Sequence, residues 1–124
     1  MENKKILIID DEPVLVKALR ESFERDGLEV LEAENGKNGL DAALLNHPDL
    51  ILLDIIMPVM DGMEMLKKLR EDIWGKTAKV LILTNLSNGE KEAVAKTLDS
   101  YGYLIKTDFK IDDIIDQVKK ILKK

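Results

Sequence analysis

Two short stretches of this sequence contain only apolar residues, and they constrain the fold more than any other feature. Leu50–Leu53 and Val80–Leu83 each run without a polar interruption. A strand with one solvent-exposed face alternates polar and apolar residues. A strand in the middle of a parallel sheet is covered on both faces, so its sequence is apolar throughout. The two runs therefore predict central strands of a sheet that carries helices on both sides.

The rest of the chain alternates between short strand-like runs and helical patterns. Pro13 is suited to a first helical turn, where its missing N–H costs nothing, and Gly27 is suited to a helix end. The predicted strands are Lys5–Ile9, Glu29–Ala33, Leu50–Leu53, Val80–Leu83 and Tyr103–Ile105. The first predicted helix runs from Pro13 to the stop at Gly27, and the others are Gly39–Asn46, Met63–Arg70, Glu90–Leu98 and Ile111–Leu122. This (βα)5 order predicts an α/β fold with a doubly wound, five-stranded parallel sheet and right-handed crossovers.

Length and composition narrow the function. The 124 residues predict one domain over 1–124, and the last helical pattern reaches the final residues, so we expect no output domain. With no cysteine and one histidine, His47, disulfides and thiolate metal sites are excluded. A net charge of −5 argues against direct nucleic-acid binding. The first apolar run, Ile6–Ile9, is too short for a signal peptide or a membrane span, so we expect a cytoplasmic protein without membrane insertion.

Polar residues stand where four of the five predicted strands end. In strand order they are Asp10, Asp11 and Glu12, then Asp54, then Thr84 and Asn85, and finally Lys106. In open parallel sheets, binding sites form beyond the carboxyl ends of the strands. Each residue alone has an ordinary explanation, such as a helix start for Asp11 or Glu12, a turn for Asp54 or a solvated lysine. Together, complementary groups at one edge favour a site.

The chemistry of this set points to a hard cation and to phosphoryl transfer. Crowded carboxylates either raise a pKa or bind a cation, and oxygen ligands without imidazole or thiolate favour Mg²⁺. A carboxylate beside Mg²⁺ can attack phosphorus and become an aspartyl phosphate. Lys106 would neutralise part of the charge, and Thr84 would donate a hydrogen bond to a phosphoryl oxygen.

The chain resembles the receiver domains of response regulators in two-component signalling. The residues that carry the resemblance are I-I-D-D-E-P at 8–13, L-L-D-I-I-M-P-V-M-D-G at 52–62, L-I-L-T-N at 81–85 and G-Y-L-I-K at 102–106. They span essentially the whole chain in order. The resemblance implies a flavodoxin-like receiver fold, in which the five strands have the spatial order 2-1-3-4-5.

The resemblance also implies residue roles. Asp54 would be the phosphoacceptor, and Asp10, Asp11, Asp54 and the backbone carbonyl of Ile56 would hold Mg²⁺. Lys106 would pair with Asp54 and then with the phosphoryl group, while Thr84 moves toward that group. Tyr103 would be the switch aromatic, although alone it is better explained as an edge-strand residue with a wet hydroxyl.

The family implies partners as well. A histidine kinase would donate the phosphoryl group, and the surface formed by the fourth helix, fifth strand and fifth helix would then bind a downstream target or a phosphotransfer protein. We expect a monomer that acts as a signalling protein, not as an enzyme on other substrates.

The sequence departs from the family pattern near the site. Thr107 follows Lys106 where the family usually has proline, and Asn85 follows Thr84 where a smaller residue is usual. Ile56 and Leu86 occupy positions that influence how water reaches the phosphoryl group, and two apolar residues there predict slow hydrolysis.

Three alternatives compete with this interpretation. A nucleotide- or flavin-binding module would need a glycine-rich loop after the first strand, where this chain has acidic residues. A phosphohydrolase of the aspartyl phosphate type would have a D-x-D motif there, but Asp10 and Asp11 are adjacent. A degenerate receiver would act only as an interaction module, and the Thr107 and Asn85 departures keep that alternative open.

Two aromatic residues outside the cluster have simpler interpretations. His47 is expected at the surface near the end of the second helix, and not as a phosphocarrier. Trp74 is expected as a cap on the core after the third helix.

Overall fold

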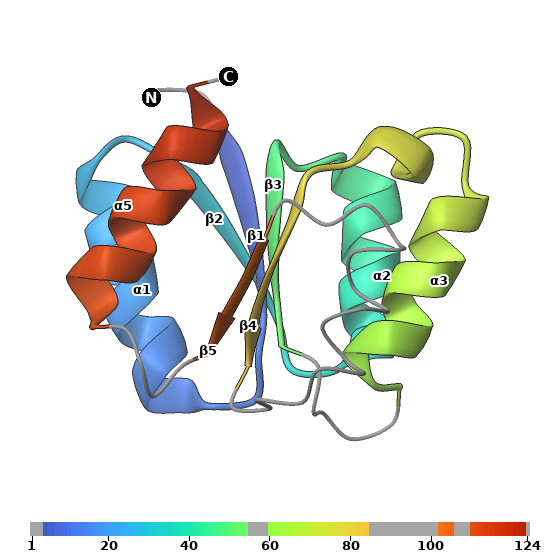
Figure 1. Ribbon diagram of the computed structural model, residues 1–124, viewed down its shortest axis with the longest axis horizontal. Coiled ribbons are helices and arrows are strands. Elements are labelled where there is room, and N and C mark those ends of the chain that lie inside the picture. The colour runs from blue at the N-terminus through green and yellow to red at the C-terminus, as the bar shows by residue number, and fades with distance from the viewer. Residues whose placement is uncertain (1–3, 55–59, 85–101, 106–109, 124) are drawn as a thin grey trace.

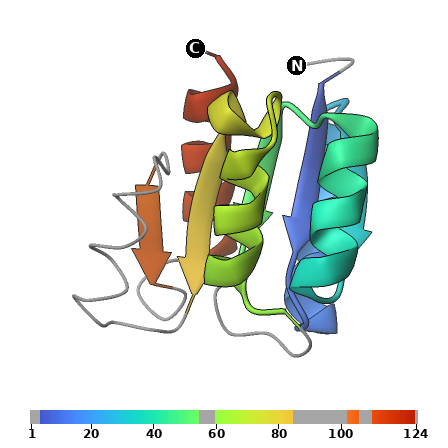
Figure 2. The ribbon, with the colours of Figure 1, turned by 90° about the vertical axis from the view of Figure 1, so that its right-hand side faces the viewer.

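Five short strands form one parallel sheet in the computed structural model (Figure 1). The structure describes residues 4–54, 60–84, 102–105 and 110–123. For Thr84 and residues 102–105 it describes the course of the strands but not the side chains. The strands are β1 (Lys5–Ile9), β2 (Glu29–Ala33), β3 (Leu50–Leu53), β4 (Val80–Thr84) and β5 (Gly102–Ile105), in the spatial order β2-β1-β3-β4-β5. The arrowheads in Figure 2 point toward one edge, so the carboxyl ends of the strands meet there.

The helices lie on both faces of the sheet, as the apolar strands require. The helices are α1 (Pro13–Arg25), α2 (Gly36–Asn46), α3 (Gly62–Glu71) and α5 (Ile111–Leu122), and a short 3₁₀ turn, η1 (Gly75–Thr77), precedes β4. Helices α1 and α5 cover one face, and α2 and α3 cover the other (Figure 1). The predicted doubly wound arrangement and the order of the first four strands are confirmed. The helix predicted over Glu90–Leu98 lies outside the described residues.

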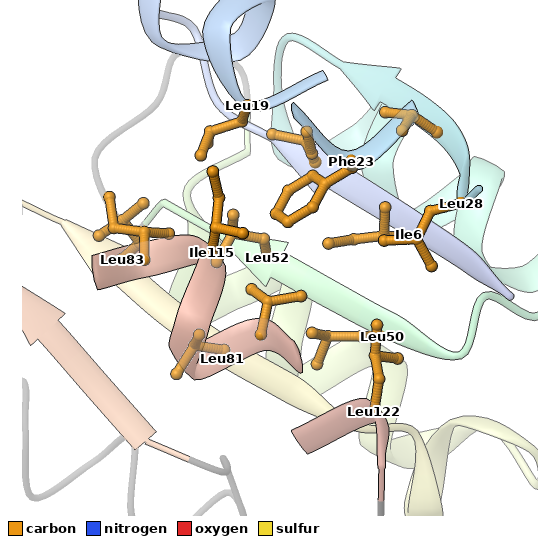
Figure 3. Close-up of a cluster of buried hydrophobic side chains, with 14 of the residues drawn as sticks. Ile6, Leu19, Phe23, Leu28, Leu50, Leu52, Leu81, Leu83, Ile115 and Leu122 are labelled. Atoms are coloured by element: carbon orange, nitrogen blue, oxygen red, sulfur yellow. The ribbon is translucent and has the colours of Figure 1, made fainter. Parts of the chain in front are cut away.

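Each face of the sheet has its own hydrophobic core. Under α1 and α5, alternate strand residues such as Ile6, Leu52 and Leu83 belong to one hydrophobic cluster with Phe23, which is fully buried (Figure 3). Under α2 and α3, the remaining strand residues, such as Ile9, pack against the other two helices. Since all four residues of β3 are buried, burial on both sides explains why its sequence does not alternate.

The predicted boundaries differ from the structure in a few places. Helix α2 begins at Gly36, three residues before the predicted start at Gly39, because the Asn35 side chain caps it by accepting a hydrogen bond from the Asn38 N–H at 2.8 Å. Helix α1 begins at Pro13 as predicted. Its N-cap is Glu12, whose side chain does not cap the helix. Among the helices in the described ranges, none is long and apolar enough to cross a membrane.

Candidate functional site

The register of β1 and β3 brings two aspartates together. Ile9 pairs with Leu53 across these neighbouring parallel strands, so Asp10 and Asp54 leave the sheet side by side. Backbone hydrogen bonds continue the sheet past the strands: the Asp54 N–H donates to the Ile9 carbonyl at 2.9 Å, and the Asp10 N–H donates to the Ala33 carbonyl at 3.1 Å. The backbones of both aspartates are thereby fixed to the ends of their neighbouring strands.

Three carboxylates converge at this point. Asp10, Asp11 and Asp54 each offer a carboxylate oxygen, and these oxygens all lie within 4.8 Å of one another. Asp10 is only 6% exposed and Asp54 only 5%, whereas Asp11 is exposed. The Asp10 Oδ1 atom also accepts a hydrogen bond from the Glu12 N–H at 2.9 Å, which fixes its orientation. The structure thus brings together the three aspartates that the receiver resemblance implies as metal ligands.

The donor set fits Mg²⁺. Burying like charges close together is costly unless a counter-charge compensates them, and a divalent cation is the compact way to supply it. All three side chains offer hard oxygen donors, which Mg²⁺ prefers, and the exposed Asp11 leaves one side of the cluster open to water. Mg²⁺ usually keeps several waters, so an open side suits it.

The other predicted site residues are placed by the strands alone or lie outside the described part of the chain. Thr84 ends β4 opposite Ile105 of β5, so it reaches the same sheet edge as Asp54. Tyr103 of β5 pairs with Ile82 of β4. Lys106 and Ile56 lie outside the described residues. Their roles therefore stay predictions.

A groove of about 500 Å³ borders the cluster between α1 and the end of β2. Asp10 and Asp11 form one end of it, and Arg20 lines its wall from α1. The Arg20 guanidinium forms ion pairs with Glu32 of β2 and with Glu24, and the hydrogen bond to Glu32 raises the pKa of Arg20 above its ordinary value. No sequence pattern indicates the pair with Glu32, because residues twelve positions apart on different elements share no periodicity.

The two aromatic residues outside the cluster lie at the opposite edge of the sheet. His47 is the exposed C-cap of α2, and its ring stacks on Trp74 with ring centroids 4.3 Å apart. Trp74 also packs against the core under α2 and α3. Both residues are therefore where the sequence predicted them, far from the acidic cluster.

Comparison with known proteins identifies the class. The sequence profile of the response regulator receiver domain matches residues 6–119, so this chain belongs to that family. The structure is similar to that of the chemotaxis response regulator CheY4 of Vibrio cholerae, with a TM-score of 0.86 at 28% identity, over 95% of this chain and 98% of that one. A CheY-like receiver domain protein from Methanospirillum hungatei JF-1 gives a TM-score of 0.88 at 26% identity, over 97% of this chain and 94% of that one. The receiver resemblance is thereby confirmed.

Particular relatives differ in how much of their length is matched. The chain is 37% identical over 122 residues to sporulation initiation phosphotransferase F of Bacillus subtilis, covering 98% of this chain and 96% of that protein. It is 34% identical over 122 residues to the alkaline phosphatase synthesis transcriptional regulatory protein PhoP of the same organism. That match covers 98% of this chain but only 50% of PhoP, so the chain spans half the length of that relative.

Proposed function

We propose that this protein is a phosphoacceptor of a two-component system, which takes a phosphoryl group from the phosphohistidine of a histidine kinase onto Asp54. The observation that carries the proposal is the buried Asp10–Asp54 pair beside the exposed Asp11 at the carboxyl edge of the sheet. Membership of the receiver family supports the same chemistry. We also propose that residues 1–124 act as one receiver domain in the cytoplasm.

Mg²⁺ is the proposed cofactor. Asp10, Asp11, Asp54 and the backbone carbonyl of Ile56 would hold it. When bound, the ion supplies positive charge that lowers the repulsion between the Asp54 carboxylate and the phosphoryl oxygens.

The proposed reaction is a direct transfer. A carboxylate oxygen of Asp54 forms a bond to phosphorus as the P–N bond of the phosphohistidine breaks, and the leaving ring keeps the electron pair of that bond and takes up a proton from water to become neutral imidazole. Burial of Asp54 limits its positions and supports an aligned attack. The Lys106 ammonium would neutralise a second phosphoryl oxygen, and the Thr84 hydroxyl would donate a hydrogen bond to a third.

We propose that Thr84 and Tyr103 carry the change to the surface formed by residues 90–98, β5 and α5. The phosphorylated protein would then bind a downstream protein or pass the phosphoryl group to a phosphotransfer protein. The name of the similar Bacillus subtilis protein, a phosphotransferase, supports the second route. The net charge of −5 supports a protein partner over direct contact with nucleic acid. We also propose that the protein is a monomer and is no enzyme toward other substrates.

The test is the intact mass of the protein after incubation with acetyl phosphate and Mg²⁺. We expect one phosphoryl adduct in the wild type, none in Asp54→Asn, and none when EDTA replaces Mg²⁺. Asp41→Asn is the matched control, because Asp41 is an exposed aspartate on α2 whose carboxylate pairs with Lys37 at the surface. An adduct in Asp54→Asn would refute the assignment of the acceptor. A folded wild type with neither adduct nor Mg²⁺ binding would favour the interaction-module alternative.

The decay of that adduct tests the hydrolysis hypothesis. Ile56 and Leu86 are expected to hinder the approach of water, so hydrolysis of the aspartyl phosphate should be slow. A lifetime of only seconds would refute this part of the proposal and leave the acceptor assignment untouched.

A further inference from the structure

The segment that follows the proposed phosphoacceptor is anchored at both of its ends. At its start, the Asp54 N–H donates to the Ile9 carbonyl at 2.9 Å. At its far end, the Met60 carbonyl accepts a hydrogen bond from the Gly36 N–H at 2.9 Å, and Asp61 then caps α3 by accepting from the Glu64 N–H at 2.9 Å. The second anchor comes from a different element, the first residue of α2.

Gly36 touches backbone and leaves no room for a side chain. A Cβ atom at this position would lie well inside the contact distance of the Met60 carbonyl oxygen, 2.9 Å from the Met60 carbonyl carbon and 3.1 Å from the Asp61 oxygen. Ordinary contacts between carbon atoms are about 3.5–4.0 Å, and real Cβ atoms almost never come closer than 3.0 Å to any heavy atom. Because every one of these neighbours is backbone, no side-chain rotation can relieve the clash. Any larger residue must push the end of the segment away by about 1 Å.

The requirement for glycine at this position is one of space. Among the described glycines only Gly27 has a positive φ, so the backbone conformation of Gly36 is open to any residue. Its helix cannot easily retreat either. One turn on, Gly39 packs on the Ile9 side chain, where a Cβ atom would lie 2.9 Å from Ile9 Cγ1. Ile9 directly precedes Asp10, so the start of α2 is held against the strand that carries the acidic cluster.

The starts of α2 and α3 accordingly lie side by side at the carboxyl edge of the sheet (Figures 1 and 2). We infer that Gly36 is a positioning residue for phosphoryl transfer. Its N–H and its lack of a side chain set where Met60 lies, six residues after Asp54 in the sequence, and so fix the far end of the stretch that begins at the proposed phosphoacceptor. This inference rests on the proposed function and adds a residue outside the acidic cluster to its machinery.

The experiment compares Gly36→Ala with Gly75→Ala. Gly75 is a matched control, since a Cβ atom there would also meet backbone, 2.9 Å from the Leu69 carbonyl carbon, but at the opposite edge of the sheet. For each protein, the phosphorylation rate with acetyl phosphate is measured as a function of Mg²⁺ concentration, together with the urea midpoint. A displacement of about 1 Å in an aligned site can cost on the order of 100-fold in rate.

We expect Gly36→Ala to lower the maximal rate by about tenfold or more and to shift the Mg²⁺ dependence to higher concentrations. Gly75→Ala should lower the urea midpoint while its rate and Mg²⁺ dependence stay within about twofold of the wild type. A folded Gly36→Ala protein that matches the wild type in both quantities would overturn the inference. So would an equal loss of rate in both variants, which would mean a general structural effect.

A second variant covers the case in which Gly36→Ala does not fold. Asn35→Ala removes the side-chain cap of α2 without adding a clash, and so loosens the anchor that Gly36 provides. It should lower the maximal rate severalfold at saturating Mg²⁺, and an unchanged rate would count against the inference. If the wild type itself forms no adduct, the proposed function has failed. If the wild type forms the adduct and the variants match it in rate and Mg²⁺ dependence, the inference alone has failed.

Discussion

Asp10→Asn is expected to stabilise the protein when Mg²⁺ is absent. The substitution keeps the shape of the side chain and an Oδ1 atom that can accept from the Glu12 N–H, but it removes one of two buried negative charges. At a separation of no more than 4.8 Å and an effective dielectric constant of about 20, two carboxylates repel by roughly 3.5 kcal/mol or more. Both Asp10 and Asp54 also interact with other groups, so the net effect of the substitution is taken as smaller than this repulsion. We therefore expect a gain of about 1–2 kcal/mol in the free energy of unfolding.

The same substitution should remove most of the stabilisation by Mg²⁺. A ligand that binds only the folded state at about 100 times its dissociation constant adds about 2.7 kcal/mol to the free energy of unfolding. Without the Asp10 carboxylate, we expect less than about 1 kcal/mol of stabilisation at the same Mg²⁺ concentration. Asp10→Asn should thus be more stable than the wild type in EDTA, and this advantage should shrink or reverse in Mg²⁺.

Urea unfolding followed by circular dichroism, in EDTA and in Mg²⁺, measures both effects. Asp41→Asn again serves as control, because its carboxylate is exposed and 3.5 Å from Lys37, and it should change stability by less than about 0.5 kcal/mol in either buffer. A variant that is less stable than the wild type in EDTA would refute the reasoning. It would mean that the contacts of the charged Asp10 outweigh its repulsion from Asp54.

Three further predictions concern stability. Leu52→Ala should cost about 2–5 kcal/mol in urea unfolding, because Leu52 is 2% exposed within the core under α1 and α5, and a loss below about 1 kcal/mol would contradict that packing. Arg20→Gln should cost less than about 1 kcal/mol at low salt, since its ion pairs are half exposed, and the loss should shrink in about 1 M NaCl, where the screening length falls to about 3 Å. Asp61→Ala should cost about 1 kcal/mol through loss of the α3 cap, whereas Asp61→Asn should be nearly neutral in the same assay.

The fold was largely predictable because β1, β3 and β4 are short, largely apolar runs that polar residues bound. Each described strand agrees with its predicted range to within one residue. The start of α2 was less predictable, since Gly36 is a poor helix former and its helical conformation depends on the Asn35 cap and on contact with Met60. The η1 turn was missed, because the Arg70 side chain holds it from α3 by donating to the Gly75 and Ala78 carbonyls. Such a contact leaves no periodic pattern in the sequence.

The acidic part of the site was also predictable, and for the same reason. Asp10, Asp11 and Asp54 closely follow buried strands, and parallel strands end at a common edge. The anchor between Gly36 and Met60 was not predictable, because it joins backbone groups of segments that are distant in sequence. A glycine in a sequence does not indicate which backbone approaches it.

The acidic residues also help to set the register that brings them together. Strands β1 and β3 are apolar on both faces, so alternation of side chains cannot fix their alignment. Polar residues at both ends can. At the start, the Lys5 N–H donates to the Asp49 carboxylate at 2.7 Å, and the Asp49 N–H donates to the Lys5 carbonyl at 2.8 Å.

At the other end, Asp10 and Asp54 stand opposite each other. Asp10 lies five positions after Lys5 on its strand, and Asp54 lies five positions after Asp49 on the other strand. A slip of one residue would break the Lys5–Asp49 pair and draw one of the terminal aspartates in among apolar neighbours, where an unpaired charge is costly. Equal spacing between the polar ends therefore specifies one alignment of two otherwise featureless strands. In that alignment the two carboxylates of the proposed metal site are adjacent, so the residues proposed for the chemistry also serve to define the fold.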